Sequence, residues 1–222
     1  MLSKKALTGI AIVILILGGA VVVYKQSHRK SQPETATNLT SDQQNQFQQK
    51  IDNLMKIVND KNSSAAQVTG AWLQIGINYE TLGQRDKEEA AFLKAAETDP
   101  KSYLPWSNLG SLYIETKNYA KAAGALQKAL DLNDSDPQLW LKWIDFNIYQ
   151  IGTDDKHIRL LFNDAYKYTH NSDLLLRQGA AYLEMTGDYS GAIAAWQEVL
   201  KESPNDVAVQ AAISADQAKL KK

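Results

Sequence analysis

The amino-acid sequence predicts an all-α protein in which paired helices stack into a solenoid behind one N-terminal transmembrane helix. Three observations predict this class. Similar residues recur 34 positions apart, apolar residues within each segment recur at steps of three and four, and Ala6 to Tyr24 contain no charge. Steps of three and four are the period of a helix with one buried face. A fixed period of about 34 residues indicates a repeat architecture.

The overall composition narrows the function classes. The chain of 222 residues contains no cysteine, which excludes disulfides and thiolate metal sites. Five of the 24 basic residues lie in the first thirty positions, which hold no acidic residue, so the remainder carries 19 basic and 25 acidic residues. A mildly acidic body argues against nucleic-acid binding, because that function needs a basic surface to neutralise phosphates.

Residues 6–24 are expected to form a membrane anchor, preceded by a basic tail at residues 1–5. A helix of this length spans roughly 28 Å, close to the hydrocarbon core of a bilayer. Basic residues flank the run on both sides, and it ends without a small-residue cleavage site, which favours an anchor. A cleaved signal peptide, giving a secreted protein, and a buried core helix are the alternatives. The charges on the two flanks nearly balance, and we expect the short tail inside and the body outside the membrane.

A linker and a leading helix are expected to connect the anchor to the repeats. Residues 25–40 are polar, and from position 31 they contain Pro, Ser and Thr without apolar periodicity, as in a flexible stalk. Residues 41–60 follow a helical period, with Ile51, Leu54 and Val58 on one stripe. Ser41 or Asp42 is the expected N-cap of this amphipathic helix.

The repeat itself is defined by seven positions that align in one register. The pairs are Trp72 and Trp106, Ile75 and Leu109, Gly76 and Gly110, Tyr79 and Tyr113, Ala91 and Ala125, Lys94 and Lys128, and Ala95 and Ala129. Each unit reads as two helices. In the first unit, Gly83 is expected to end the first helix in a left-handed conformation, and Asp99-Pro100 ends the second.

Glycine within a helix is unfavourable by about 0.8–1 kcal/mol relative to alanine, so Gly76 and Gly110 need a packing reason. We expect them to form a notch that lets the two helices of a hairpin approach closely. Ala95 and Ala129 are the expected flat side of the partner helix. The large aromatic side chains beside the notch then fill the gap to the next hairpin.

These residues resemble the tetratricopeptide repeat family, whose pattern is Trp-x2-Leu-Gly-x2-Tyr followed by Gly, Ala, an aromatic residue, Ala and Pro. The first unit departs from it at Arg85 and Glu88, where the family prefers an aromatic residue and an alanine. The predicted units are residues 66–102, 103–136, a degenerate 137–171 and 172–204, with a capping helix at 205–222. The expected packing residues are Trp72, Gly76, Tyr79, Phe92, Ala95, Trp106, Gly110, Tyr113, Ala129, Trp140, Gly179, Tyr182 and Trp196.

The resemblance implies about four hairpins in a right-handed α-solenoid, with the first helix of each unit lining a concave groove that grips a peptide or helix. The expected groove residues are Leu73, Ile77, Glu80, Leu104, Ser107, Asn108, Ser111, Glu115, Leu141, Lys142, Asp145 and Ile148. A clamp for a C-terminal carboxylate is not expected, because Leu73, Ile77 and Leu104 occupy the positions where that clamp needs charge-assisted donors. The mixed apolar and acidic lining favours a partner segment with apolar anchors and some positive charge.

No catalytic constellation accompanies the repeats. His157 and His170 have no ligand partner at helical spacing, so we expect no metal and no cofactor. Trp143 is the one tryptophan that could serve as a ligand platform instead of core. The predicted function is a non-enzymatic, membrane-tethered scaffold for protein binding in assembly, secretion or quality control of a bacterial envelope complex. An accessory or regulatory subunit of an envelope enzyme is the alternative.

Overall fold

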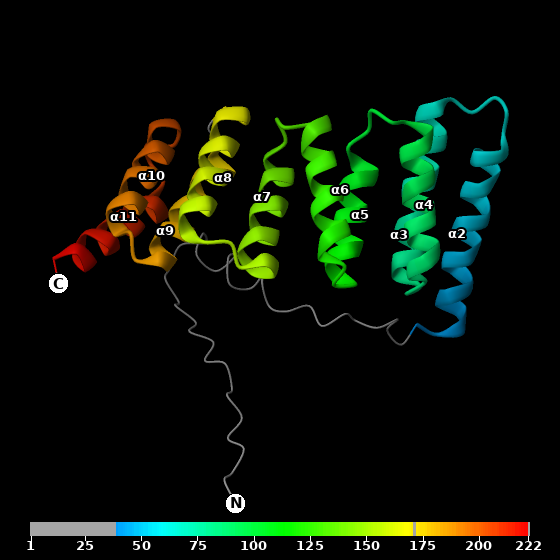
Figure 1. Ribbon diagram of the computed structural model, residues 1–222, viewed down its shortest axis with the longest axis horizontal. Coiled ribbons are helices and arrows are strands. Elements are labelled where there is room, and N and C mark those ends of the chain that lie inside the picture. The colour runs from blue at the N-terminus through cyan, green and yellow to red at the C-terminus, as the bar shows by residue number, and fades with distance from the viewer. Residues whose placement is uncertain (1–38, 171, 222) are drawn as a thin grey trace, which may run out of the picture. The chain divides into compact units, whose positions relative to one another are not determined.

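The computed structural model describes residues 39–170 and 172–221, and these residues form helices without any strand. The helices are α2 (Ser41–Asn59), α3 (Ala65–Thr81), α4 (Arg85–Thr98), α5 (Leu104–Glu115), α6 (Tyr119–Leu132), α7 (Pro137–Phe146), η1 (Asn147–Ile151), α8 (Asp155–Tyr168), α9 (Asp173–Thr186), α10 (Tyr189–Glu202) and α11 (Val207–Leu220). Figure 1 shows them in chain order. The predicted all-α helical repeat is confirmed.

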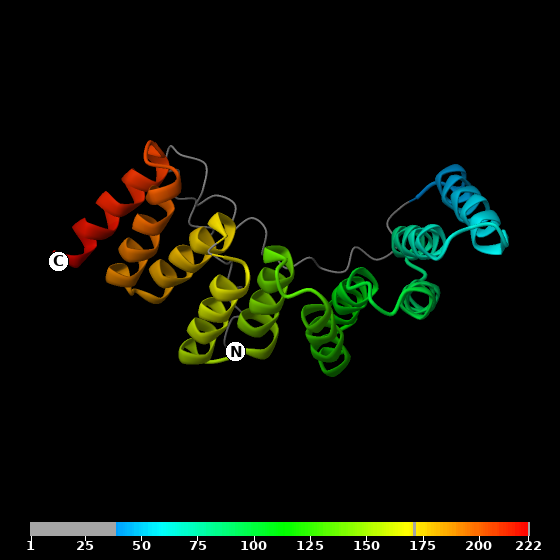
Figure 2. The same cartoon turned by 90° about the horizontal axis from the view of Figure 1, so that it is seen from above.

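The described residues divide into two compact units. One contains α2 to α8 and the first residues of α9, up to Leu175, and the other runs from Leu176 through α10 and α11. In the first unit, α3 lies beside α4 and α5 beside α6, as Figures 1 and 2 both show. Each pair is a helical hairpin, and α2 packs against α3 ahead of the first hairpin.

The predicted anchor, residues 6–24, lies outside the described residues, as do the tail and nearly all of the linker. Across the part of the chain that the structure describes, no helix combines the length and apolar character that crossing a membrane requires.

Side-chain caps fix where several helices begin. The N-cap of α2 is Thr40, so the predicted cap at Ser41 or Asp42 is wrong by one or two positions. Thr40 Oγ1 accepts a hydrogen bond from the Gln43 backbone N–H at 3.3 Å, and Gln43 Oε1 accepts one from the Thr40 N–H at 2.9 Å. This reciprocal capping box satisfies two backbone donors that the helix leaves without partners. Ser64 and Gln67 form the same arrangement at the start of α3.

The glycine notches are present, but the side chains nearest to them are not the predicted alanines. A Cβ at position 76 would lie 2.7 Å from Cδ1 and 2.8 Å from Cζ of Phe92, and a Cβ at position 110 would lie 2.5 Å from Cδ2 of Leu126. The atoms nearest to the two notches belong to Phe92 and Leu126, which are 34 positions apart. Ala95 and Ala129 are nonetheless fully buried. The 34-residue spacing of the glycines predicted that the two helix backbones approach closely. It did not predict which side chain lies against each glycine.

Two hydrophobic clusters join the first helices of the first unit. The first joins Ile51 of α2, Ile75 of α3 and Ala91 of α4, with Trp72 and Tyr79 packed against it. The second joins side chains from four helices, α4 to α7. Its buried members are Phe92, Leu109, Leu112, Tyr113, Ala122, Ala125, Leu126 and Phe146. Adjacent hairpins therefore share one core, as expected for a stack of repeats.

The turn between the two helices of each hairpin uses one left-handed residue. Gly83 has φ 68°, as predicted, and Lys117, Gly152 and Gly187 have φ 59°, 71° and 84°. Lys117 follows Gly83 by 34 positions, whereas the next two steps are each one residue longer. In the third hairpin, the extra residue precedes Gly152, where α7 continues as the π-helical turn η1. An inserted residue inside a helix is commonly accommodated in this way.

Lys117→Gly is expected to raise the free energy of unfolding by roughly 0.5–1 kcal/mol, because glycine adopts the left-handed conformation without the steric conflict that a Cβ introduces. Lys117 is exposed, so the substitution removes no buried contact. Urea unfolding of the full chain followed by circular dichroism measures the change. Lys117→Ala is the control, because alanine keeps the Cβ and should leave the stability within a few tenths of a kcal/mol.

Candidate binding face

The first helices of the hairpins present one face, the first-helix face, defined by Ile77, Glu80, Leu104, Ser107, Ser111, Glu115 and Lys142. Helical spacing places Leu104, Ser107 and Ser111 on one side of α5, since residues three and four apart are neighbours on a helix surface. The same rule places Ile77 and Glu80 together on α3. Lys142 belongs to α7, so this face draws on three consecutive hairpins of one unit.

Lys142 connects the third hairpin to the second. Its Nζ donates to Ser107 Oγ at 2.9 Å, to Ser111 Oγ at 2.9 Å and to the Ser107 backbone oxygen at 3.3 Å. Burial lowers the pKa of Lys142, although Asp136 and Glu80 oppose this by stabilising the cation. All three donors of the ammonium thus meet neutral acceptors, and its positive charge is balanced only by carboxylates farther away.

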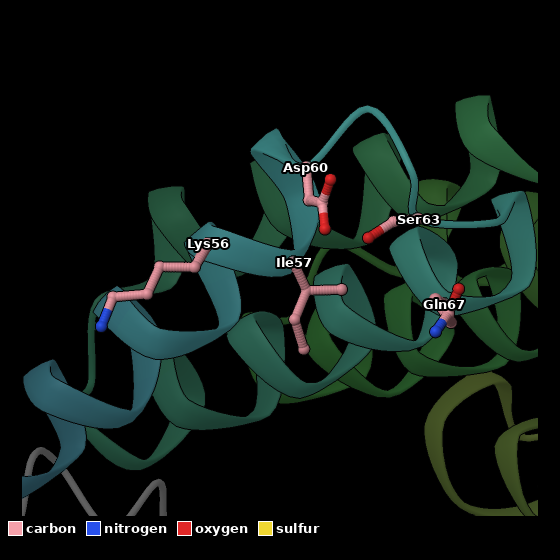
Figure 3. Close-up of a pocket in the computed structure, with 5 residues that line it drawn as sticks. All are labelled: Lys56, Ile57, Asp60, Ser63 and Gln67. Atoms are coloured by element: carbon pink, nitrogen blue, oxygen red, sulfur yellow. The ribbon is translucent and has the colours of Figure 1, made fainter.

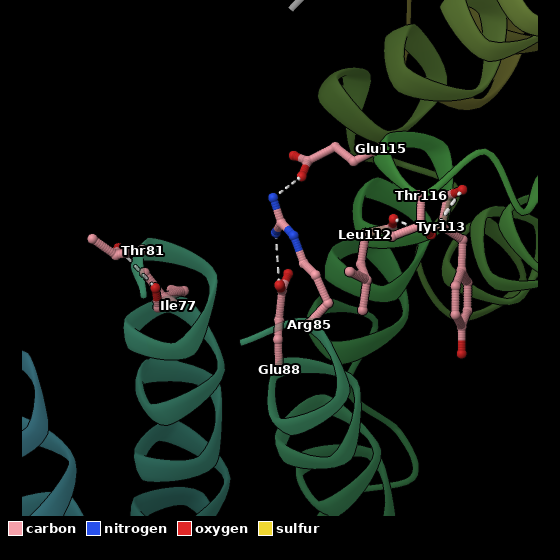
Figure 4. Close-up of polar contacts among 8 residues, drawn as sticks. All are labelled: Ile77, Thr81, Arg85, Glu88, Leu112, Tyr113, Glu115 and Thr116. Carbon is pink, nitrogen blue, oxygen red and sulfur yellow. Dashed lines mark hydrogen bonds and ion pairs between the residues drawn. The ribbon is translucent and has the colours of Figure 1, made fainter. Parts of the chain in front are cut away.

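Arg85 makes a second polar connection, between the first and second hairpins (Figure 4). Its Nη1 lies 2.7 Å from Oε2 of Glu88 on the same helix, and its Nη2 lies 2.7 Å from Oε2 of Glu115 at the end of α5. Glu80 lies close enough to influence the charge of both Arg85 and Glu115. One guanidinium thus faces three carboxylates.

Excess negative charge and burial both favour the protonated carboxyl groups here. Burial raises the pKa of Glu88 from its ordinary 4.5 to about 7, although the ion pair with Arg85 opposes the shift. Partial burial of the Glu115 side chain, which is 35% exposed, also raises its pKa, and the neighbouring Glu80 adds to this effect. An additional cation beside these carboxylates would relieve their repulsion.

The predicted groove residues differ widely in how accessible they are. Ile77 is 40% exposed and Leu104 is 45% exposed, so both present apolar surface to solvent. Leu73 instead packs against the second hydrophobic cluster, which α4 to α7 form, so it is a contact between repeats. Ser107 is buried beneath Lys142. The partly buried members are Asn108, Ser111, Leu141, Lys142, Asp145 and Ile148, and Glu80 and Glu115 are exposed.

Arg85 and Glu88 are functional candidates that the sequence reasoning missed. Both stand where the repeat pattern prefers an aromatic residue and an alanine, and this departure was the available signal. Opposite charges three positions apart on a helix form an ion pair. The sequence could not reveal that Glu88 is only 2% exposed or that Arg85 also reaches Glu115.

Two other sites carry less chemistry. Trp143 is partly buried against the second hydrophobic cluster and stacks on Phe146 of the same helix with ring centroids 5.8 Å apart, which favours a packing role. A pocket between the end of α2 and the start of α3 is lined by Lys56, Ile57, Asp60, Ser63 and Gln67 (Figure 3). Gln67 in this pocket is already engaged in the capping box with Ser64.

The expected packing residues are mostly buried. The buried ones are Gly76, Phe92, Ala95, Gly110, Tyr113, Ala129, Trp140, Gly179, Tyr182 and Trp196, whereas Trp72, Tyr79 and Trp106 are partly buried. His157 is exposed, and its Nδ1 lies 2.5 Å from Oδ2 of Asp154. Among residues 39–170 and 172–221, no three His, Asp or Glu side chains are grouped so that they could hold a metal ion.

Comparison with known families identifies the repeats. Models described as tetratricopeptide repeat match residues 69–102, 103–136 and 173–206. These three segments are tetratricopeptide repeats. The third hairpin, which contains η1, lies between the second and third matched segments.

Similar curated proteins are much longer than this chain. Superkiller complex protein 3 of Mus musculus is 43% identical over 75 residues, and its Homo sapiens counterpart is 41% identical over 75 residues. Tetratricopeptide repeat protein 37 of Xenopus laevis is 38% identical over 74 residues. Each match covers 32% of this chain and 5% of the relative.

Similar solved structures include two named MamA. MamA AMB-1 is 15% identical with a TM-score of 0.47, covering 83% of this chain and 94% of the other. MamA MSR-1 is 17% identical with a TM-score of 0.45, covering 82% of this chain and 95% of the other.

Proposed function

We propose that this protein is a non-catalytic, membrane-tethered scaffold whose first-helix face binds a peptide or helix of a partner protein. Tetratricopeptide repeats support protein binding as the general function. The observation that carries the proposal is the pair of exposed apolar side chains on first helices, Ile77 and Leu104, on the face that also carries the carboxylates of Glu80 and Glu115. Exposed apolar side chains rimmed by polar groups are typical of interaction sites.

The proposed partner segment carries apolar anchors and at least one Lys or Arg. Ile77 and Leu104 would contact the anchors, and the carboxylates of Glu80 and Glu115 would attract the basic side chain. Arg85 already neutralises part of this negative charge, so the preference is for a modestly basic segment. An acidic segment would add to the repulsion among the three carboxylates.

The tether is part of the same proposal. The uncharged run from Ala6 to Tyr24, flanked by basic residues, supports a single membrane helix with the repeats on the outer side of a bacterial membrane. A scaffold held there would meet partners in or beside the envelope, where it would serve assembly, secretion or quality control. An accessory subunit of an envelope enzyme would use the same face, and the identity of the captured partner distinguishes the two.

Photo-crosslinking in native membranes tests the proposal. A benzoylphenylalanine residue is placed at position 77 or 104 of the full chain, and at position 93 as a control. Leu93 is 38% exposed, like Ile77, but lies on the second helix of its hairpin. Positions 77 and 104 should give a shared adduct absent at position 93, and mass spectrometry should place the crosslink in an apolar segment with Lys or Arg. The same membranes test the tether, because an alkaline carbonate wash should leave the full chain in the pellet.

Point variants provide a second test of the proposed binding face. Ile77→Asp or Leu104→Asp should abolish the adduct formed from the other position, whereas Leu93→Asp should leave it unchanged. Leu73 is a poor test position, since its contact with the core cluster would confuse lost binding with lost stability. Identical adducts from positions 77 and 93, or a captured segment with a net negative charge, would contradict the proposed face.

A further inference from the structure

Five side chains from α9, α10 and α11 meet inside the C-terminal unit. Glu184 of α9 accepts a hydrogen bond at Oε1 from Trp196 Nε1 of α10 at 2.9 Å. Asp216 of α11 accepts one at Oδ1 from Lys219 Nζ at 3.0 Å. Lys219 Nζ also lies 4.6 Å from the centre of the Tyr189 ring. Asp216 lies close enough to Glu184 to raise its pKa, so the cluster brings the last helix together with the two before it.

Asp216 is the unusual member of this cluster. Its side chain is fully buried, and its Oδ2 has no hydrogen-bond donor among the groups described. A buried carboxylate oxygen without a donor is unfavourable, because it has lost its hydration and gained nothing in return. A proton on Glu184 removes the problem, since a protonated carboxyl group donates an O–H bond to the facing carboxylate.

The surroundings of Glu184 favour that proton. Burial raises the pKa of Glu184, and the negative charge of Asp216 raises it further, while Trp196 and Lys219 act in the opposite direction. Lys219 and Tyr189 are the other ionisable groups at the cluster, and contact with Asp216 raises the pKa of Lys219. Lys219 therefore remains a cation, and Glu184 is the group that titrates.

We propose that Glu184 and Asp216 share one proton that holds α11 against α9 and α10, and that losing this proton as pH rises loosens α11. The sign follows from the direction of the Glu184 pKa. A carboxyl group that binds its proton more tightly in the folded state stabilises that state fully below its ordinary pKa of 4.5. The stabilisation is lost as pH rises through the higher folded pKa.

Loosening would change the surface of the C-terminal unit. Val209 of α11 is buried, and its side chain would become accessible together with the apolar side of α10 that contains Trp196 and Val199. The terminal helix would thus act as a cover controlled by pH. This inference does not depend on the first-helix face, because all of its residues lie in α9 to α11.

Hydrogen–deuterium exchange of the full chain between pH 5 and pH 8 tests the proposal. Rates are corrected for the intrinsic pH dependence of amide exchange, and peptides from α3 serve as the internal reference. Protection of the α11 amides, Val207–Leu220, should fall by at least about tenfold as pH rises, with a midpoint above 4.5. The α3 peptides should show no such midpoint.

Two neutral variants and one control make the test specific. Glu184→Gln and Asp216→Asn each place a permanent N–H donor between the two side chains, so each should keep α11 protected at pH 8. Glu198→Gln is the control, since Glu198 is an exposed carboxylate of α10 that pairs with Lys201. It should leave the midpoint unchanged. A wild-type α11 whose protection does not vary with pH, or a midpoint that persists in both neutral variants, would overturn the proposal.

Discussion

Arg85→Met is expected to lower the free energy of unfolding by about 3 kcal/mol at pH 8, because it leaves the buried Glu88 carboxylate without its ion-pair partner. At pH 5 the loss should be smaller by about 1 kcal/mol, since a carboxyl group with a strongly raised pKa is then neutral in the folded protein. The pKa of Glu88 is already about 7 with Arg85 present, and removing the cation raises it further. Urea unfolding at both pH values measures the difference.

Lys94→Met is the matched control for Arg85→Met. Lys94 and Glu97 form a pair with the same three-residue spacing on the same helix, but their side chains are 56% and 65% exposed. Its loss should change stability by no more than about 0.5 kcal/mol at either pH. Adding Glu88→Gln to Arg85→Met should restore most of the stability at pH 8. Equal losses from Arg85→Met at pH 5 and pH 8 would show that the Glu88 charge is not the cause.

Gly76→Leu is expected to lower the free energy of unfolding by about 3 kcal/mol, because the added side chain has no space beside Phe92. The Cβ alone would lie 2.8 Å or less from three ring atoms, so changing the side-chain rotamer cannot remove the conflict. The ring cannot move freely, since Phe92 is 2% exposed and belongs to the core cluster. Thermal and urea unfolding of the full chain measure the loss.

Gly70→Leu controls for the change in helix propensity. Gly70 lies on the same helix, and a Cβ there would meet nothing within 4 Å. The substitution should be neutral or stabilising by up to about 1 kcal/mol. The next hairpin offers the same comparison, with Gly110→Leu against Gly124→Leu on α5 and α6. If the two substitutions on one hairpin changed the free energy of unfolding equally, close packing would not explain the glycine within the helix.

The sequence was most informative where one residue type must recur for a geometric reason. Gly76 and Gly110 predicted a close approach of two helices, and Gly83 predicted a left-handed turn, because glycine tolerates both conditions at no steric expense. The partner of each glycine was less predictable. The second helix repeats both an alanine, Ala95 and Ala129, and a large apolar residue, Phe92 and Leu126. Spacing alone does not say which of the two lies against the glycine.

Features that depend on contacts between repeats could not be predicted from the sequence. Lys142 looked like a groove residue, yet its ammonium lies among the hydroxyls of Ser107 and Ser111. Leu73 looked equally available, but it packs against the neighbouring core. Both outcomes depend on how far one hairpin is displaced from the next. A 34-residue period fixes the order of the repeats but leaves that distance open.

The third hairpin shows a different limit. Its degenerate pattern indicated a departure from the repeat, and Trp143 and Ile144 stand where Leu and Gly are usual. The physical form of the departure is the π-helical turn η1, which ends at Ile151 before the left-handed Gly152. Helix propensity does not distinguish a π-helical turn from an α-helical one, so this feature required coordinates.

The core cluster that joins Phe92, Leu126 and Phe146 has a consequence for how the chain can be divided. Phe92 belongs to one module and Phe146 to the module two places later, so cutting the chain at a module boundary exposes large aromatic side chains on both sides of the cut. A fragment ending at residue 102 would expose hydrophobic side chains at its C-terminal end and would tend to associate. The smallest stable, monomeric fragment of this region must therefore contain the whole shared cluster. The boundaries of the 34-residue repeat do not coincide with the limits of that cluster.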